Sequence, residues 1–172
     1  MPYTTINKST DHFNTKLYTG NGSTQNITGV GFQPDWTWTK KRNGTTGHRL
    51  VDAVRGATKA LFSNGTNAES TEANGLTAFA SDGYALGTDG NYNNSSDTYV
   101  SWNWKAANSS GSSNSDGSIT STVSANTTAG FSIVTYTGTG SAASFGHGLS
   151  TPDIVLIKDR TDNGNEWYFH TT

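Results

Sequence analysis

The sequence predicts an all-β protein: an antiparallel β-sandwich of the jelly-roll type, with one complete unit and a partial second unit. Three observations favour this fold class. Thr (28), Ser (20), Asn (17) and Gly (20) make up 85 of the 172 residues, and these residue types suit short strands and turns. Nineteen residues are aromatic while the net charge is only −2, a combination that argues against disorder. Leu, Glu, Lys and Arg, which favour helices, are scarce.

The individual strands are predicted from short runs of β-branched and aromatic residues that turn signals separate. Asn64-Gly65 and Asp82-Gly83 are two such turns, and turns recur every 8–12 residues, as in sandwich folds. In the segment 98–104, Val100, Trp102 and Trp104 alternate with polar residues and therefore share one face of a strand. In chain order, the expected strands are 36–40, 48–54, 60–63, 77–79, 84–86, 98–104, 131–136 and 154–158.

The chain also repeats itself at an offset of 118 residues. No gap is needed to align residues 13–42 with 131–160, and the matches include the rare Pro. An internal repeat of this kind indicates two copies of one supersecondary unit. The matched positions are Phe13/Phe131, Tyr18-Thr19-Gly20/Tyr136-Thr137-Gly138, Gly22-Ser23/Gly140-Ser141, Pro34-Asp35/Pro152-Asp153, Lys40/Lys158 and Arg42/Arg160.

The repeat divides the chain into three parts. Unit one is expected over residues 3–105 and the second, incomplete unit over 118–172. Between them, residues 106–117 are rich in Ser, Asn and Gly and carry one charge, a composition typical of a flexible linker. Half of a β-domain cannot bury its apolar face alone. We therefore expect either a longer chain or neighbouring chains to complete the second unit.

Several short motifs resemble a known family. They are Gly31–Asp35, His48–Asp52 followed by Val54–Gly56, Ser81–Gly83 and Asp97–Lys105. These motifs are similar to a repeated concanavalin A-like or laminin-G-like domain of marine phage virion proteins, found in tail fibres and appendages. The resemblance covers nearly the whole chain. It implies a jelly-roll fold, a virion location and a structural or adhesive role.

Catalytic and metal sites are not predicted. A glycosidase needs two carboxylates across a cleft, and the only glutamates are Glu69 and Glu72 in one polar loop and Glu166. No Gly-x-Ser-x-Gly nucleophile motif occurs, and the four histidines are scattered. The run 89–97 offers oxygen ligands for calcium but lacks the Gly and Glu of an EF-hand, which favours a plain loop. We therefore assign no catalytic, cofactor-binding or metal-binding residue.

Sugar binding is the alternative function that the residues themselves suggest. Exposed indole rings could stack on sugar rings, and the candidates are Trp36, Trp38, Trp102 and Trp104. Their alternation along strands favours packing in the core over sugar binding. At the repeat positions of Trp36 and Trp38 stand Ile154 and Leu156, a replacement that also favours core packing.

The expected partners follow from charge, hydropathy and the resemblance. The near-neutral charge argues against nucleic-acid binding, for which a basic patch is expected. No apolar stretch approaches the ~18 residues of a membrane-spanning helix, and no signal peptide is apparent at residues 1–9. The absence of Cys excludes disulfides. We expect other virion proteins or copies of the chain as partners, with host surface glycans as the alternative.

Overall fold

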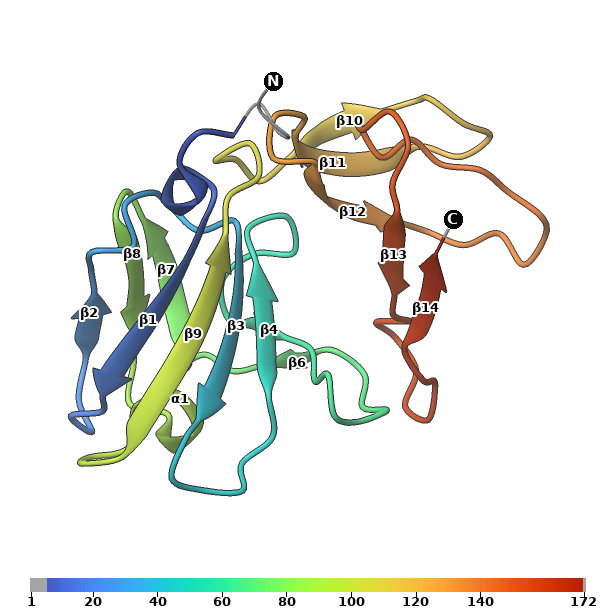
Figure 1. The fold of residues 1–172 in the computed structure, drawn as a ribbon. Coiled ribbons are helices and arrows are strands. Elements are labelled where there is room, and N and C mark those ends of the chain that lie inside the picture. The colour runs from blue at the N-terminus through green and yellow to red at the C-terminus, as the bar shows by residue number, and fades with distance from the viewer. Residues whose placement is uncertain (1–5, 172) are drawn as a thin grey trace.

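The structure, a computed structural model, describes residues 6–171 and consists mostly of antiparallel strands (Figure 1). A short 3-10 helix η1 (Ser9–Asp11) and one helical turn, α1 (Gly90–Asn93), are the helices of the described residues, and none of these could span a membrane. The strands are β1 (Phe13–Thr19), β2 (Gln25–Ile27), β3 (Trp36–Lys41), β4 (Arg49–Asp52), β5 (Lys59–Ala60), β6 (Ser70–Thr71), β7 (Leu76–Ala80), β8 (Gly83–Leu86), β9 (Thr98–Trp104), β10 (Ser112–Asn114), β11 (Ser121–Asn126), β12 (Phe131–Tyr136), β13 (Ile154–Ile157) and β14 (Tyr168–Thr171). The prediction of a mostly β, antiparallel chain is confirmed.

Two sheets face each other in the N-terminal part of the chain. A four-stranded sheet with the order β1-β9-β3-β4 lies in front of a three-stranded sheet with the order β2-β8-β7 (Figure 1). β9 pairs with both β1 and β3 and therefore lies in the interior of the larger sheet. The buried apolar cluster comes from strands of both sheets, from β5 and from α1; it consists of Ile27, Val51, Ala60, Leu76, Tyr84, Leu86 and Tyr92.

The inner face of the four-stranded sheet is largely polar. Thr37, Thr39, Ser101 and Asn103 are each at most 2% exposed. Three of them are hydrogen-bonded to one another: Thr37 Oγ1 donates to Asn103 Oδ1 (3.3 Å), and Asn103 Nδ2 donates to Ser101 Oγ (3.1 Å). Buried hydroxyls and amides are tolerated when they are hydrogen-bonded in this way. The alternation along β3 and β9 therefore directs their tryptophans to the opposite face.

Tyr84 links the two sheets, because its hydroxyl on β8 donates to Ser101 Oγ on β9 over 2.7 Å. Both side chains are buried, so Tyr84→Phe should lower the free energy of unfolding by about 1 kcal/mol, the usual net value of one hydrogen bond. Urea denaturation followed by fluorescence measures this change. Combining Tyr84→Phe with Ser101→Ala should cost less than the two single substitutions added together; strict additivity would show that the hydroxyls are not coupled.

The second copy of the repeat forms two further small sheets, β10-β11-β12 and β13-β14, which lie to the right of the first part in Figure 1. Within the segment 106–117, predicted as a linker, residues 112–114 form β10, and Ala106 is buried. The backbone N–H groups of Ala106 and Asn108 donate to Asp35 Oδ2 over 2.6 and 2.9 Å. The division of the chain into two units and a linker stays a prediction, but this segment is anchored at both ends.

Candidate functional site

The four tryptophans singled out from the sequence form one continuous aromatic layer. Trp36 and Trp38 on β3 and Trp102 and Trp104 on β9 are partly exposed and lie on the outer face of the four-stranded sheet. The ring centroids of Trp36 and Trp104 are 4.5 Å apart, and those of Trp38 and Trp102 are 6.0 Å apart. The expectation that these side chains pack in the core is wrong, since small polar residues fill the inner face instead.

The second copy of the repeat covers one end of this aromatic layer. Phe131, the first residue of β12, stacks on Trp36 with centroids 5.8 Å apart. Beyond this contact an open groove of about 710 Å³ runs between the two parts of the chain. Its walls are Trp36, Trp38 and Trp104 on one side and all residues of β12 and β13 on the other. Trp102 does not line this groove.

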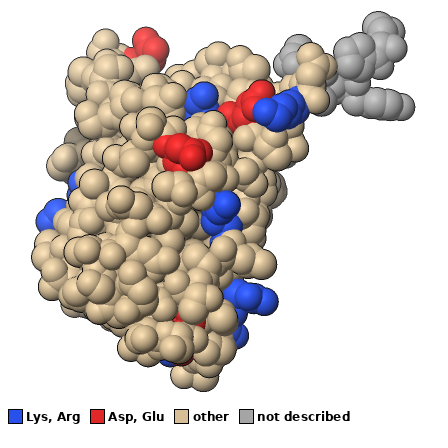
Figure 2. All heavy atoms as spheres, turned by 90° about the vertical axis from the view of Figure 1, so that its left-hand side faces the viewer, with Lys and Arg blue, Asp and Glu red and all other residues tan. Residues whose placement is uncertain are grey.

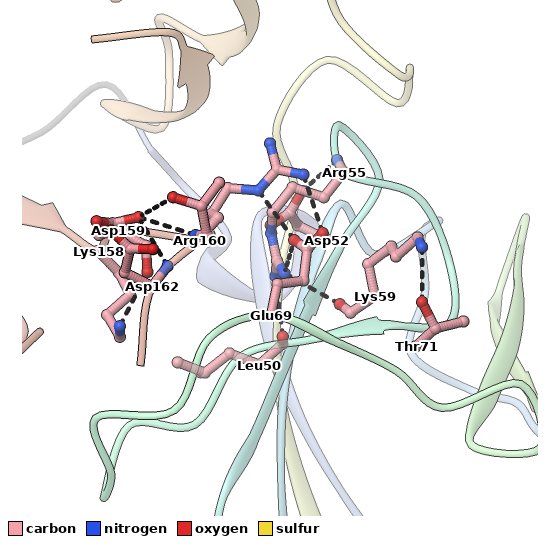
Figure 3. Close-up of polar contacts among 11 residues, drawn as sticks. Leu50, Asp52, Arg55, Lys59, Glu69, Thr71, Lys158, Asp159, Arg160 and Asp162 are labelled. Carbon is pink, nitrogen blue, oxygen red and sulfur yellow. Dashed lines mark hydrogen bonds and ion pairs between the residues drawn. The ribbon is translucent and has the colours of Figure 1, made fainter. Parts of the chain in front are cut away.

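A polar junction fixes the second copy against the first at the other end of the groove (Figure 3). Arg160 donates two hydrogen bonds to the Glu69 carboxylate, each 3.0 Å long. Arg55 donates to the same carboxylate (3.0 Å) and to Asp52 (2.5 Å), and its side chain is only 4% exposed. Burial alone would raise the pKa of Glu69, but the hydrogen bonds from Arg160 and Arg55 outweigh it and lower that pKa.

Backbone contacts reinforce the junction. The Glu69 N–H donates to the Arg160 carbonyl (2.9 Å), and Gly164 N–H donates to the Thr66 carbonyl (3.1 Å). The indole N–H of Trp167 donates to the Phe62 carbonyl (2.8 Å). Loop 159–167 is thus bound to loop 62–69. No sequence pattern indicates this pairing, because the partners are about a hundred positions apart and lie in loops without periodicity.

One comparison with known proteins assigns the chain to a family. A family model described as a domain of unknown function, DUF7483, matches residues 8–172, nearly the whole chain. The chain belongs to the DUF7483 family. No curated protein and no solved structure matches it. The family description names no activity, so the phage link that the motifs imply stays a prediction.

Two of the three glutamates of this DUF7483 chain, Glu69 and Glu72, are engaged in structural contacts, and the third, Glu166, is exposed. Glu69 is held by two arginines, and Glu72 accepts from Arg49 (3.3 Å) and from the Tyr92 hydroxyl (2.6 Å). In the run considered for calcium, Asp89 caps α1 and Asp97 pairs with Lys41. Among residues 6–171, no cluster of three or more His, Cys, Asp or Glu side chains could hold a metal ion.

Figure 2 shows the left-hand side of the DUF7483 fold as an almost uncharged surface. Basic and acidic side chains are scattered over it, singly or in small groups of both signs, and form no continuous basic patch on this face. An even, weakly charged surface of this kind attracts polyanions little. That nucleic acid is not a partner stays a prediction. The lack of a continuous basic patch on this face agrees with it.

His48 sits beside the aromatic layer and makes it sensitive to pH. The Trp38 indole N–H donates to His48 Nδ1 over 2.7 Å. Since an indole N–H can only donate, Nδ1 must be unprotonated in this arrangement. Burial, followed by the positive charge of Lys40, lowers the pKa of His48 below its ordinary 6.5.

Protonating His48 should therefore move the Trp38 indole N–H resonance in an NMR titration, with a midpoint below pH 6.5. The unfolded chain binds the proton more readily than the folded chain. Stability should therefore fall as pH drops through 6.5 towards the folded pKa, and it should not change further on this account below that pKa. His48→Gln should abolish both changes. A Trp38 resonance that moves equally in His48→Gln would assign the titration to another group.

Proposed function

We propose that this chain is a non-enzymatic structural protein of a phage particle, in a tail fibre, an appendage or a capsid decoration, that mediates assembly or adhesion to a host surface. One observation carries the proposal: the β13–β14 hairpin leaves large apolar side chains exposed. Ile154 is 58% exposed, Leu156 49%, Tyr168 63% and Phe169 63%. Apolar surface that is contiguous and exposed marks sites of interaction with other macromolecules. The partners proposed are other virion proteins or copies of the chain.

Two further features support an architectural role. In the junction, the Glu69 carboxylate is ion-paired with Arg55 and Arg160 and holds the two copies together. A carboxylate held in this way is poorly placed to accept or donate a proton in catalysis. The two facing sheets of the N-terminal part are compatible with the jelly-roll arrangement that the motifs imply, and we retain that arrangement as part of the proposal.

Electron microscopy of purified phage particles that encode the chain tests its location. Antibodies raised against the recombinant chain should label intact particles at a defined position, such as a fibre or the capsid surface. Unlabelled particles, with the chain found only in lysed cells, would overturn the virion assignment. For the assembly surface, Leu156→Lys should reduce binding of the recombinant chain to particles, and Leu17→Lys, which alters a leucine on β1 that is 61% exposed, should not.

Glycan binding is the second candidate, and the aromatic layer favours it. Trp36, Trp38, Trp102 and Trp104 present partly exposed indole rings side by side, and flat aromatic rings stack on sugars. On a glycan array the wild-type chain should bind defined surface sugars, and Trp102→Ala should lose that signal while Tyr168→Ala keeps it. An array without signal for the folded wild-type chain would exclude this candidate.

A further inference from the structure

The three strands that follow residue 130 correspond to three strands of the first unit. The repeat offset of 118 places Phe131 of β12 on Phe13 of β1, and Ile154 of β13 on Trp36 of β3. β14 corresponds to β4, because β13 pairs with β14 as β3 pairs with β4. Ile154 faces Thr171 where Trp36 faces Asp52, so the second hairpin is one residue longer than the first. The β3–β4 pairing of the first unit thus recurs in the second copy as the β13–β14 pairing.

Among residues 6–171, no strand takes the place of β9 between β12 and β13. In the first unit, β9 lies between β1 and β3 and pairs antiparallel with both. In the second copy, β12 pairs with β11 on one edge and β13 pairs with β14 on one edge. No described strand pairs with the other edge of either. The 710 Å³ groove is lined by both of these strands along their whole length.

We propose that this groove accepts a β-strand of the β9 type from another polypeptide chain. This inference rests on the assembly role proposed above and names the partner. An unpaired strand edge is a template for backbone hydrogen bonding, and strand addition of this kind uses the main chain for affinity and alternate side chains for specificity. A strand that enters the groove would form backbone hydrogen bonds with the free edges of both β12 and β13. Its aromatic side chains would cover Ile154 and Leu156, which are exposed in this structure.

The first unit gives the expected register. Trp104 of β9 lies opposite both Phe13 and Trp36, so the corresponding residue of the incoming strand should lie opposite both Phe131 and Ile154. Asn103 lies opposite Thr37, whose repeat position is Val155. These pairs fix the position of the incoming strand to a single residue.

Asp153 supplies an anchor for the residues after the incoming strand. Its counterpart Asp35 accepts the N–H groups of Ala106 and Asn108, which directly follow β9. Asp35 is fully buried by these contacts, whereas Asp153 is exposed and lines the groove. Asp153 therefore has the position and the exposure needed to receive the same two N–H groups from a partner.

Binding of a synthetic peptide with the sequence of residues 97–108 tests the proposal on the full chain. Isothermal titration calorimetry should show one peptide bound per chain, and hydrogen exchange should show new protection of the β12 and β13 amides. Asp153→Ala and Leu156→Lys should each weaken binding by about tenfold or more, and Asp11→Ala, which removes an exposed carboxylate at η1, should leave it unchanged. The same peptide with proline at the positions of Ser101 and Asn103 should not bind, because proline cannot donate to a ladder.

The register is tested by disulfide formation, since the chain contains no Cys of its own. A peptide carrying Asn103→Cys should cross-link to Val155→Cys at least about tenfold faster than to Ile157→Cys, because cross-strand neighbours alone bring their Cβ atoms close enough. The proposal is overturned by absent peptide binding, by binding that ignores Asp153 and Leu156, or by a chain that closes its own groove in a self-dimer. Unlabelled phage particles together with specific peptide binding would remove the virion assignment and leave the strand acceptor standing.

Discussion

Replacing Glu69 with alanine should lower the free energy of unfolding by about 3 kcal/mol, because the substitution leaves a buried charge without one of its partners. The Arg55 side chain is 4% exposed and would keep only Asp52 as a carboxylate partner. The Arg160 side chain would lose both of its hydrogen bonds to the first unit. Urea denaturation measures the loss, and hydrogen exchange should show faster exchange across residues 159–167, the loop that Glu69 holds.

Glu166→Ala is the matched control, since this glutamate is exposed and should change stability by less than about 0.5 kcal/mol. The pH dependence provides a second check. The pKa of Glu69 is lower in the folded chain than its ordinary 4.5, so its contribution is present above that value and is lost as pH falls through the folded pKa. Glu69→Gln should reduce the loss of stability that the wild-type chain shows as the pH falls through this pKa. Equal acid sensitivity in wild type and Glu69→Gln would place the effect elsewhere.

Asp35→Ala should lower the free energy of unfolding by about 2–4 kcal/mol, because the two backbone N–H groups after β9 that donate to Asp35 would lose their acceptor. Asp35 is fully buried, and its Oδ2 accepts from Ala106 and Asn108. The backbone of Asp35 also pairs with Trp104 and Ala53, so the loss should loosen the exit of β9 and the start of β3 together. Thermal unfolding of the variant measures the cost.

Asp153→Ala is the control for Asp35→Ala, because it makes the same change at the repeat position, where the side chain is exposed. Asp153→Ala should lower the free energy of unfolding by less than about 0.5 kcal/mol. Burial raises the pKa of Asp35, although the N–H donors of Asn108 and Ala106 oppose that rise. The folded chain therefore holds this proton more tightly than the unfolded chain. Stability from this group should decline as pH rises from 3.8 to the folded pKa, and Asp35→Asn should remove the decline.

The pattern of alternating residues predicted which side chains share a face but not which face is buried. Trp36 and Trp38 do lie together, as do Trp102 and Trp104, yet the buried face carries Thr37, Thr39, Ser101 and Asn103. A periodicity of two is the same for both faces, and hydrophobicity alone selects the tryptophans for the core. The actual choice depends on a network between hydroxyls and amides of two strands some 66 positions apart, such as Thr37 and Asn103.

The junction and the linker illustrate a second limit. Arg160 aligns with Arg42 in the repeat, and the alignment does not show that Arg160 binds Glu69 of the first unit. The composition of 106–117 predicts a flexible linker, and it gives no sign that residues 112–114 pair with β11. In both places the deciding interaction joins segments that composition and local pattern treat separately.

The loop 159–167 also decides how tension would travel through the chain. A force applied at β14 meets the Trp167–Phe62 and Arg160–Glu69 bonds before it reaches the segment 106–117, because these bonds clamp the second copy directly to loop 62–69 of the first. The clamp therefore takes the load before the hydrogen bonds that anchor the segment 106–117 to Asp35 and to β11. Under a pulling force, the hydrogen bonds of the clamp would break first and the segment 106–117 would then extend. The chain would therefore lengthen in two steps.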